Sequence, residues 1–186
     1  MSTKQEIFTL MGGRVKIHRG HYNPTSDAVW LAAFAPHNAK TALDVGIGTG
    51  GVSLCYLANN PDTKITGIDT SDDMLTACKH NAHHNADLCS WVSRCIARVR
   101  PMGTFCIITD ATTIAQVIAE MSKKLGDITI FPLFGAKSTA ERVLISGKLG
   151  TKGISVLHNG LPMNYEPILR DGLTIADNLS TLTKKC

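Results

Sequence analysis

The chain has 186 residues and a mass of 20.0 kDa, which fits one domain with a single core. Its 19 Lys and Arg residues against 15 Asp and Glu residues give a net charge of +4, which permits a nucleic-acid partner without requiring one. The sequence has no apolar leader and no apolar run of about 18 residues, so it indicates neither a secreted nor a membrane protein. We therefore expect one cytoplasmic domain over residues 1–186, with a polar tail from about residue 176.

The first part of the chain predicts a hairpin, a helix and a strand. Short apolar runs at 7–10 and 15–17 flank Gly12-Gly13, which is typical of a hairpin. Ser26 or Asp27 is a candidate cap for a helix that reaches residue 34. A buried strand is expected over 41–45.

The pattern then alternates between helix and strand. We expect a helix over 52–57, a strand over 64–68, a helix from Ser71 to about 81–85 and a helix over 91–99. A strand over 104–108 precedes a helix over 114–125 ended by Gly126, and the last two strands are expected over 128–131 and 142–146. This alternation predicts an α/β fold with a largely parallel sheet.

The stretch LDVGIGTGG, which follows the strand over 41–45, is the strongest site signal and fits two cofactors. Read as Gly46, Gly48 and Gly51, it matches a dinucleotide turn; read as Gly46, Gly48 and Gly50, it matches an S-adenosylmethionine turn. Asp44 separates the two, because a carboxylate beside the turn would repel a pyrophosphate and attract the ammonium of a methionine moiety. We therefore favour S-adenosylmethionine as the cofactor.

Asp69 stands at the end of the next predicted strand, about two dozen residues after the glycine turn. A carboxylate there can accept hydrogen bonds from both hydroxyls of an adenosine ribose. Because both cofactors contain that ribose, Asp69 supports a nucleoside site without choosing between them.

Several segments together resemble one protein family. GHYNPTSDAVWLAAFAP, LDVGIGTGG, GIDTSDDM and NAHHN are similar to the class I S-adenosylmethionine-dependent methyltransferases, and most to the branch that methylates the adenine amino group of tRNA-valine. CSWVSRCIARVRPMGTFCII, IFPLFGAKSTAERVLISGK and VLHN resemble the later part of that branch. The resemblance implies a Rossmann-like fold and an enzyme of tRNA modification with tRNA as its substrate. The sequence leaves the oligomeric state open, so a homo- or hetero-oligomer stays among the partner predictions.

The resemblance also assigns cofactor contacts. It implies that Asp44, Gly46, Gly48 and Gly50 contact the methionine end and that Asp69 contacts the ribose. Tyr22, Thr25 and Asp27 fall in a segment that closes over the cofactor in relatives, although Tyr22 fits a packing role equally well. These contacts constitute the predicted site: Tyr22, Asp44, Gly46, Gly48, Gly50 and Asp69.

One family motif is missing. Members of this branch hold the target amino group with an Asn-Pro-Pro-Tyr motif after the fourth strand, and this sequence lacks it, so we predict no catalytic residue. The sequence passes from Asn85 almost directly to the helix around Trp91, which predicts a reduced five-stranded sheet in the family order second, first, fifth, seventh, sixth, with the final strand antiparallel. Were residues instead missing from the sequence, the intact mass would lie well above 20.0 kDa.

Weaker patterns leave other functions open. His80, His83 and His84 have helical metal-ligand spacing, but nothing completes a site and we predict no metal. The lysines and arginines between residues 123 and 152 are expected to form a solvated face more readily than an RNA surface. The six cysteines lack a C-x-x-C pair and are expected to be reduced thiols. A degenerate binding module and, less favoured, a nicotinamide-dependent oxidoreductase remain alternatives to the methyltransferase.

Overall fold

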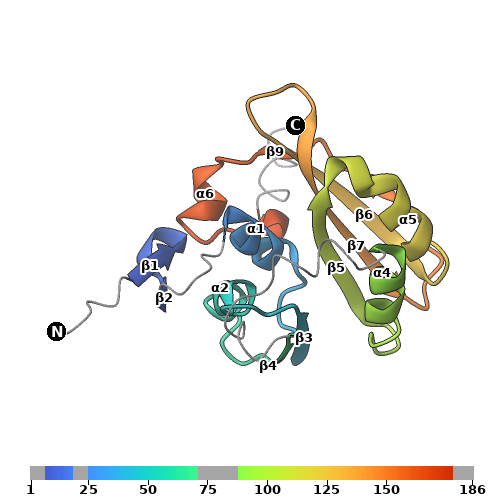
Figure 1. Cartoon of the computed structure of the whole chain (residues 1–186), viewed down its shortest axis with the longest axis horizontal. Helices are drawn as coiled ribbons and strands as arrows, with labels where there is room; N and C mark the ends of the chain where they lie inside the picture. Colours follow the sequence, from blue (N-terminus) through green and yellow to red (C-terminus); the bar gives the residue numbers. More distant parts are fainter. Residues whose placement is uncertain (1–6, 19–24, 71–87, 178–186) are drawn as a thin grey trace. The chain divides into compact units, whose positions relative to one another are not determined.

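The computed structural model describes residues 7–18, 25–70 and 88–177 of the chain (Figure 1). Its residues form two compact units. Unit 1 consists of residues 1–84 and 166–186, and unit 2 consists of residues 85–165. The single domain expected over 1–186 stays a prediction.

Unit 1 begins with the expected hairpin. β1 (Ile7–Leu10) pairs antiparallel with β2 (Val15–His18), so that Leu10 lies opposite Val15. The short 3-10 turn η1 (Met11–Gly13) joins the two strands. Leu10, Met11 and Val15 are buried, so the hairpin contributes apolar side chains to the core of unit 1.

Two helices form the centre of unit 1. α1 (Ser26–Phe34) packs against α2 (Gly51–Leu57), and Trp30 is fully buried. Neither Ser26 nor Asp27 caps α1, contrary to expectation. The N-cap is Thr25, whose carbonyl oxygen accepts a hydrogen bond from the amide of Ala28 at 3.1 Å. The Thr25 side chain makes no capping hydrogen bond at this end of the helix.

β3 (Thr41–Val45) and β4 (Lys64–Ile68) have the predicted bounds and pair in parallel. Their register places Asp44 opposite Gly67 and Val45 opposite Ile68. Parallel pairing in this register brings the carboxyl ends of both strands to the same edge, where the glycine turn and Asp69 follow.

The chain returns to unit 1 after unit 2. α6 (Glu166–Leu169) packs against α1 and η1. The Asn59 side chain donates a hydrogen bond to the carbonyl oxygen of Gly172 at 2.9 Å. Thr174 is buried, and its hydroxyl donates to Asp177 at 2.6 Å while accepting from the Asp177 amide at 3.1 Å. This reciprocal cap starts a helical turn where the sequence predicted a polar tail.

Unit 2 contains a mixed sheet in the order β5–β7–β6–β8. β7 (Ala140–Leu149) is antiparallel to both of its neighbours, β5 (Thr104–Asp110) and β6 (Leu125–Phe134). The short strands β8 (Val156–Leu157) and β9 (Leu161–Pro162) were not predicted, and both run parallel to β6. Val143, Leu144 and Ile145 of β7 are at most 2% exposed, so the central strand carries the core of the unit.

α4 (Leu88–Ile96) and α5 (Ile114–Met121) pack on each other beside the sheet (Figure 1). The short turn η2 (Ala111–Thr113) precedes α5. The predicted helix over 114–125 is too long, because Leu125 and Gly126 already belong to β6 and pair with the end of β7. Gly126 is therefore a strand residue, where the sequence indicated a helix stop.

The predicted strands occur with the expected neighbours within each unit. In unit 1, β4 pairs with β3; in unit 2, β7 lies between β5 and β6 and is antiparallel to both. A single five-stranded sheet running through both units stays a prediction.

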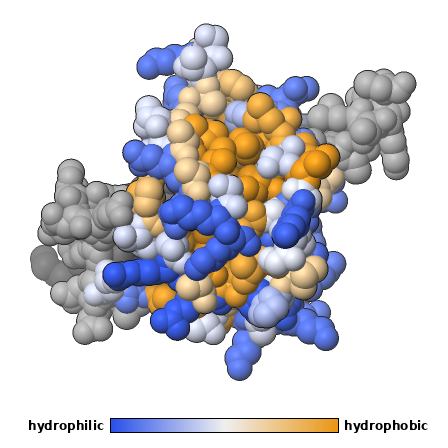
Figure 2. All heavy atoms as spheres, turned by 90° about the vertical axis from the view of Figure 1, so that its right-hand side faces the viewer, coloured by the Kyte–Doolittle hydropathy of each residue, from blue (hydrophilic) through white to orange (hydrophobic). Residues whose placement is uncertain are grey.

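Apolar side chains also reach the surface of unit 2. Ile154 is 84% exposed and Leu157 is 69% exposed, in and before β8. Figure 2 shows apolar surface lying between strongly hydrophilic side chains on the face that it presents. No helix within 7–18, 25–70 and 88–177 is both long enough and apolar enough to cross a bilayer.

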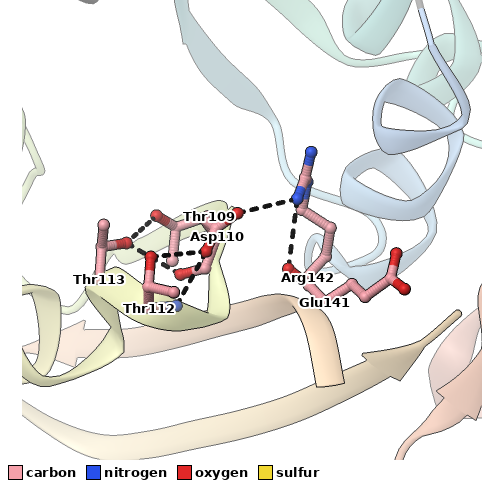
Figure 3. A network of polar contacts seen from close by, with 6 residues as sticks. All are labelled: Thr109, Asp110, Thr112, Thr113, Glu141 and Arg142. Atoms are coloured by element: carbon pink, nitrogen blue, oxygen red, sulfur yellow. Dashed lines mark hydrogen bonds and ion pairs between the residues drawn. The ribbon is translucent and has the colours of Figure 1, made fainter. Parts of the chain in front are cut away.

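A polar cluster fastens the carboxyl end of β5 to the start of β7 (Figure 3). Asp110 accepts hydrogen bonds from the amide of Thr112 at 2.9 Å and from its hydroxyl at 2.7 Å. Its other oxygen pairs with Arg142 at 3.1 Å. The Thr112 hydroxyl, above all, lowers the pKa of Asp110, and the positive charge of Arg142 adds to this. Asp110 thus caps η2, and its ion pair with Arg142 joins two residues that lie opposite each other in the β5–β7 register.

We predict that Gly126→Ala destabilises the protein by about 1–3 kcal/mol, because an added methyl group would overlap the backbone of Thr151 and Lys152. Urea unfolding followed by circular dichroism measures the loss. Gln116→Ala, on the exposed face of α5, is the control and is expected to be close to neutral. Equal stability of the two variants would contradict the prediction.

Candidate functional site

The glycine turn lies between β3 and α2 in unit 1. Gly46, Gly48 and Gly50 have φ angles of +79°, +52° and +83°. Gly50 is the left-handed N-cap of α2, whereas Gly51 is an ordinary first residue of that helix and has no positive φ. The backbone thus requires glycine at the three positions of the G-x-G-x-G interpretation.

Hydrogen bonds hold the turn against the end of β4. The amides of Gly46 and Ile47 both donate to the carbonyl oxygen of Ile68, at 2.8 and 3.1 Å. Gly67 has no side chain, and a Cβ there would overlap Ile47. The turn therefore packs directly on β4 through the Ile47 side chain.

Asp69 follows β4 and binds the turn with its side chain. Its Oδ2 accepts a hydrogen bond from the Gly48 amide at 3.0 Å, and its Oδ1 accepts one from the Thr70 amide at 2.6 Å. Each carboxylate oxygen can accept two hydrogen bonds. These two amides therefore fix the orientation of the carboxylate beside the turn.

Asp44 lies at the end of β3, and its Oδ2 accepts a hydrogen bond from the Ser53 hydroxyl at 2.6 Å. Burial raises the pKa of Asp44 above its ordinary 3.8, and the nearby charge of Asp69 raises it further, whereas the Ser53 hydrogen bonds act in the opposite direction. Ser53 is only 7% exposed, on the first turn of α2. The site thus concentrates two carboxylates, which favours a ligand with positive charge and hydroxyl donors.

The turn has an open side. A Cβ built on Gly46 finds no atom within 4 Å, and one built on Gly48 meets only the Gly46 carbonyl oxygen at 4.0 Å. This space, next to the Asp44 and Asp69 carboxylates, fits an adenosyl amino acid, whose ammonium and ribose hydroxyls are all donors. It fits a pyrophosphate poorly, because like charges repel.

The structure brings together five of the six predicted site residues: Asp44, Gly46, Gly48, Gly50 and Asp69. Tyr22 lies outside the described residues, as do His80, His83 and His84. Thr25 and Asp27 lie in the first turn of α1.

Sequence analysis missed two contributors to the site, Ser53 and Thr70. Ser53 stands three residues after the N-cap Gly50, and a hydroxyl in the first turn of a helix can point back to the preceding strand. This spacing is the sequence feature that could have identified Ser53 as a site residue. No sequence feature could have identified Thr70, because it contributes only its backbone amide.

The cysteines behave as expected where they are described. Cys55, Cys89, Cys95 and Cys106 are free thiols. Burial raises the pKa of Cys55 on α2 to about 11. Because the thiolate is the reactive form, this cysteine is not a candidate nucleophile.

Comparisons with known proteins agree with the geometry. Residues 42–126 match the model of a methyltransferase domain. A release factor glutamine methyltransferase of Caulobacter vibrioides is 43% identical over 58 residues, which cover 31% of this chain and 20% of that protein. A tRNA1(Val) (adenine(37)-N6)-methyltransferase of Glaesserella parasuis is 30% identical over 70 residues, 37% of this chain and 28% of that protein.

A solved structure gives the fold. The crystal structure of a predicted O-methyltransferase from Agrobacterium tumefaciens matches with a TM-score of 0.58 and 17% identity, covering 73% of this chain and 85% of that one. The fold is therefore the Rossmann-like methyltransferase fold. The chain matches less than a third of the length of each of the two curated relatives.

We predict that Gly46→Ala loses affinity for S-adenosylhomocysteine by more than its stability loss explains, because the methyl group enters the open side of the turn. Calorimetric titration measures the affinity. Gly13→Ala is the matched control: Gly13 also has a positive φ, +93°, and no atom within 4 Å of an added Cβ. Both variants are expected to lose about 1–2 kcal/mol of stability. Equal affinities of the two variants would contradict a cofactor at this turn.

We also predict a pH dependence that belongs to Asp44. Only the ionised carboxylate attracts an ammonium group, so affinity for S-adenosylhomocysteine is complete above the raised pKa of Asp44 and falls as the pH drops through it. The titration is repeated between pH 4 and 8, the range of the assay. Asp44→Asn is expected to bind roughly tenfold more weakly and to lose this pH dependence. Ser53→Ala should move the fall to higher pH, since it removes a hydrogen bond to the ionised form. An unchanged pH profile in Asp44→Asn would refute this assignment.

Proposed function

We propose that the protein is an S-adenosylmethionine-dependent methyltransferase that acts on an adenine amino group in tRNA. The observation that carries the first part is the pair of carboxylates, Asp44 and Asp69, beside a glycine turn with an open side. The tRNA adenine is supported by the Glaesserella parasuis relative and by the net charge of +4. Release factor and ribosomal RNA are the alternative acceptors, because other relatives are named for them.

Each site residue has a defined part in this proposal. S-adenosylmethionine would supply a methyl group on a sulfonium, so that the new N–C bond would form in line with the C–S bond that breaks, with S-adenosylhomocysteine leaving and the amino nitrogen losing a proton. Asp69 accepts the ribose hydroxyls while the amides of Gly48 and Thr70 keep its carboxylate in place. Asp44, oriented by Ser53, attracts the ammonium. These contacts supply positioning, which is the main catalytic contribution that such a transfer requires.

A catalytically degenerate binding module is the second candidate. It is favoured by the absence of an Asn-Pro-Pro-Tyr motif from the sequence, which leaves the acceptor amino group without an assigned partner. The two candidates share the cofactor site and differ only in turnover. A second subunit would be one source of the missing acceptor contacts, so the predicted homo- or hetero-oligomer is part of this proposal.

Transfer of tritiated methyl groups separates these candidates. The protein is incubated with labelled S-adenosylmethionine and, separately, unmodified cytoplasmic tRNA, ribosomal RNA and a release factor. We predict label in tRNA, and a loss of at least about tenfold in binding and transfer for Asp69→Ala, because it removes charge-assisted hydrogen bonds to the ribose. Asp62→Ala, which removes an exposed carboxylate from the same unit, is the control.

The outcomes of this experiment are distinct. Label in the release factor or ribosomal RNA would correct the acceptor and keep the activity. Binding of S-adenosylhomocysteine without label in any acceptor would support the degenerate module. No binding, together with stabilisation by NAD, would overturn the assignment of the cofactor.

A further inference from the structure

Positive charge is divided unequally between the two units. Unit 2 contains nine Lys and Arg residues against five Asp and Glu residues, whereas unit 1 contains ten of each. The whole net charge of +4 therefore belongs to unit 2, which is the smaller unit. The carboxylate site described above lies in unit 1, so it does not account for this excess of cations.

Five of these cations lie at the end of β7 or in the turns next to the strand ends beside it, and this set is here named the basic end: Arg98 and Arg100 between α4 and β5, Lys124 just before β6, Lys148 in β7 and Lys152 after it. β5 and β6 begin at this end and β7 finishes there, because Lys148 lies opposite both Thr104 and Gly126. The backbone of Lys152 lies against Gly126. Arg100 belongs to the turn before β5, where its carbonyl oxygen accepts a hydrogen bond from Gly103 at 2.8 Å.

The charged groups of the basic end are available to a partner. Arg98, Arg100, Lys124 and Lys152 are exposed and Lys148 is half-buried. Within the described residues, no hydrogen bond or ion pair engages the side chain of any of the five.

Two acidic residues lie near the basic end without neutralising it. Glu120 pairs with Lys123 and also interacts with the charge of Lys124, and Asp127 lies against Gly153. The five cations outnumber these two carboxylates, so the basic end keeps an excess of positive charge.

An aromatic side chain continues this surface along α4. Trp91 and Arg94 lie three residues apart in α4, which places them on one face of the helix, and Arg98 lies in the turn that follows it. All three are exposed, with Trp91 at 36%, while Val92, Cys95 and Ile96 are buried on the opposite face. The helix thus presents Trp91 and Arg94 on its exposed face.

We propose that the basic end and the Trp91 face of α4 bind single-stranded nucleic acid, with the cations contacting successive phosphates and Trp91 stacking on a base. Several unpaired cations in a row fit any polyanion. An exposed tryptophan one helical turn from an arginine fits one with flat, unpaired bases, because every base offers a π-face for stacking. This favours a nucleic acid over an acidic polypeptide. The surface lies outside the cofactor turn, so the inference goes beyond the proposed transferase activity.

Fluorescence anisotropy with a labelled 20-nucleotide RNA, and with DNA of the same sequence, tests this inference without cofactor. The full chain is compared with Arg98→Gln/Arg100→Gln/Lys152→Gln. The control is Lys16→Gln/Lys40→Gln/Lys64→Gln, which removes the same charge from exposed lysines of unit 1. We expect the unit 2 triple variant to bind at least about tenfold more weakly at low salt and its log–log salt slope to fall by roughly two. The control should lose less than about threefold, since it changes only the long-range field.

Substitutions of Trp91 test the stacking part of the proposal in the same binding assay. Trp91→Ala is expected to bind roughly tenfold more weakly with the same salt slope, whereas Trp91→Phe keeps a ring and should recover most of the affinity. Thermal unfolding of each variant separates loss of binding from loss of folding. Tighter binding of RNA than of DNA identifies RNA as the partner, and the reverse identifies DNA. Equal losses in both triple variants, or displacement by polyglutamate as effective as by unlabelled RNA, would overturn the proposal.

Discussion

The candidate site depends on one constraint, the attachment of the glycine turn to the end of β4. Two amides of the turn share the carbonyl oxygen of Ile68, and a third donates to the Asp69 carboxylate. These bonds satisfy donors that a left-handed glycine backbone would otherwise leave to solvent. They also fix Asp69 near Asp44, and two carboxylates held this close raise the cost of leaving the site without a cation or hydroxyl donors. The hydrogen bonds that hold the glycine turn in place thus also position the two carboxylates that determine which ligands the site prefers.

The parts that could be predicted from the sequence are those set by local pattern. β3, β4 and the turn between β3 and α2 depend on a short apolar run and on glycines with positive φ, which are readable within a few residues. The end of α5 depends on contacts between residues that are far apart in the sequence. Gly126 looks like a helix stop, but its strand partner Lys148 lies far along the chain, and this long-range pairing decides its state.

The same distinction applies within the site. Asp44 and Asp69 could be predicted because each follows a strand, and parallel strand ends meet at one edge. Ser53 could not be assigned with the same certainty, since its hydrogen bond to Asp44 depends on how α2 leaves the turn. The acceptor side of the site has neither a sequence motif nor described residues to define it. A family resemblance can therefore supply a cofactor site and still leave the reaction without its acceptor contacts.

Charge explains why two surfaces are needed if the acceptor is a nucleic acid. The cofactor turn carries two carboxylates, which repel phosphates, and unit 1 as a whole has no net charge with which to hold them. A phosphodiester backbone must then be retained elsewhere, and only a target base, which is uncharged, can approach the turn without penalty. Unit 2 has the excess of cations that such retention requires. If both proposals hold, carboxylates that face the methyl donor and cations that face the acceptor backbone belong to different units, which avoids placing like and opposite charges in competition at short range.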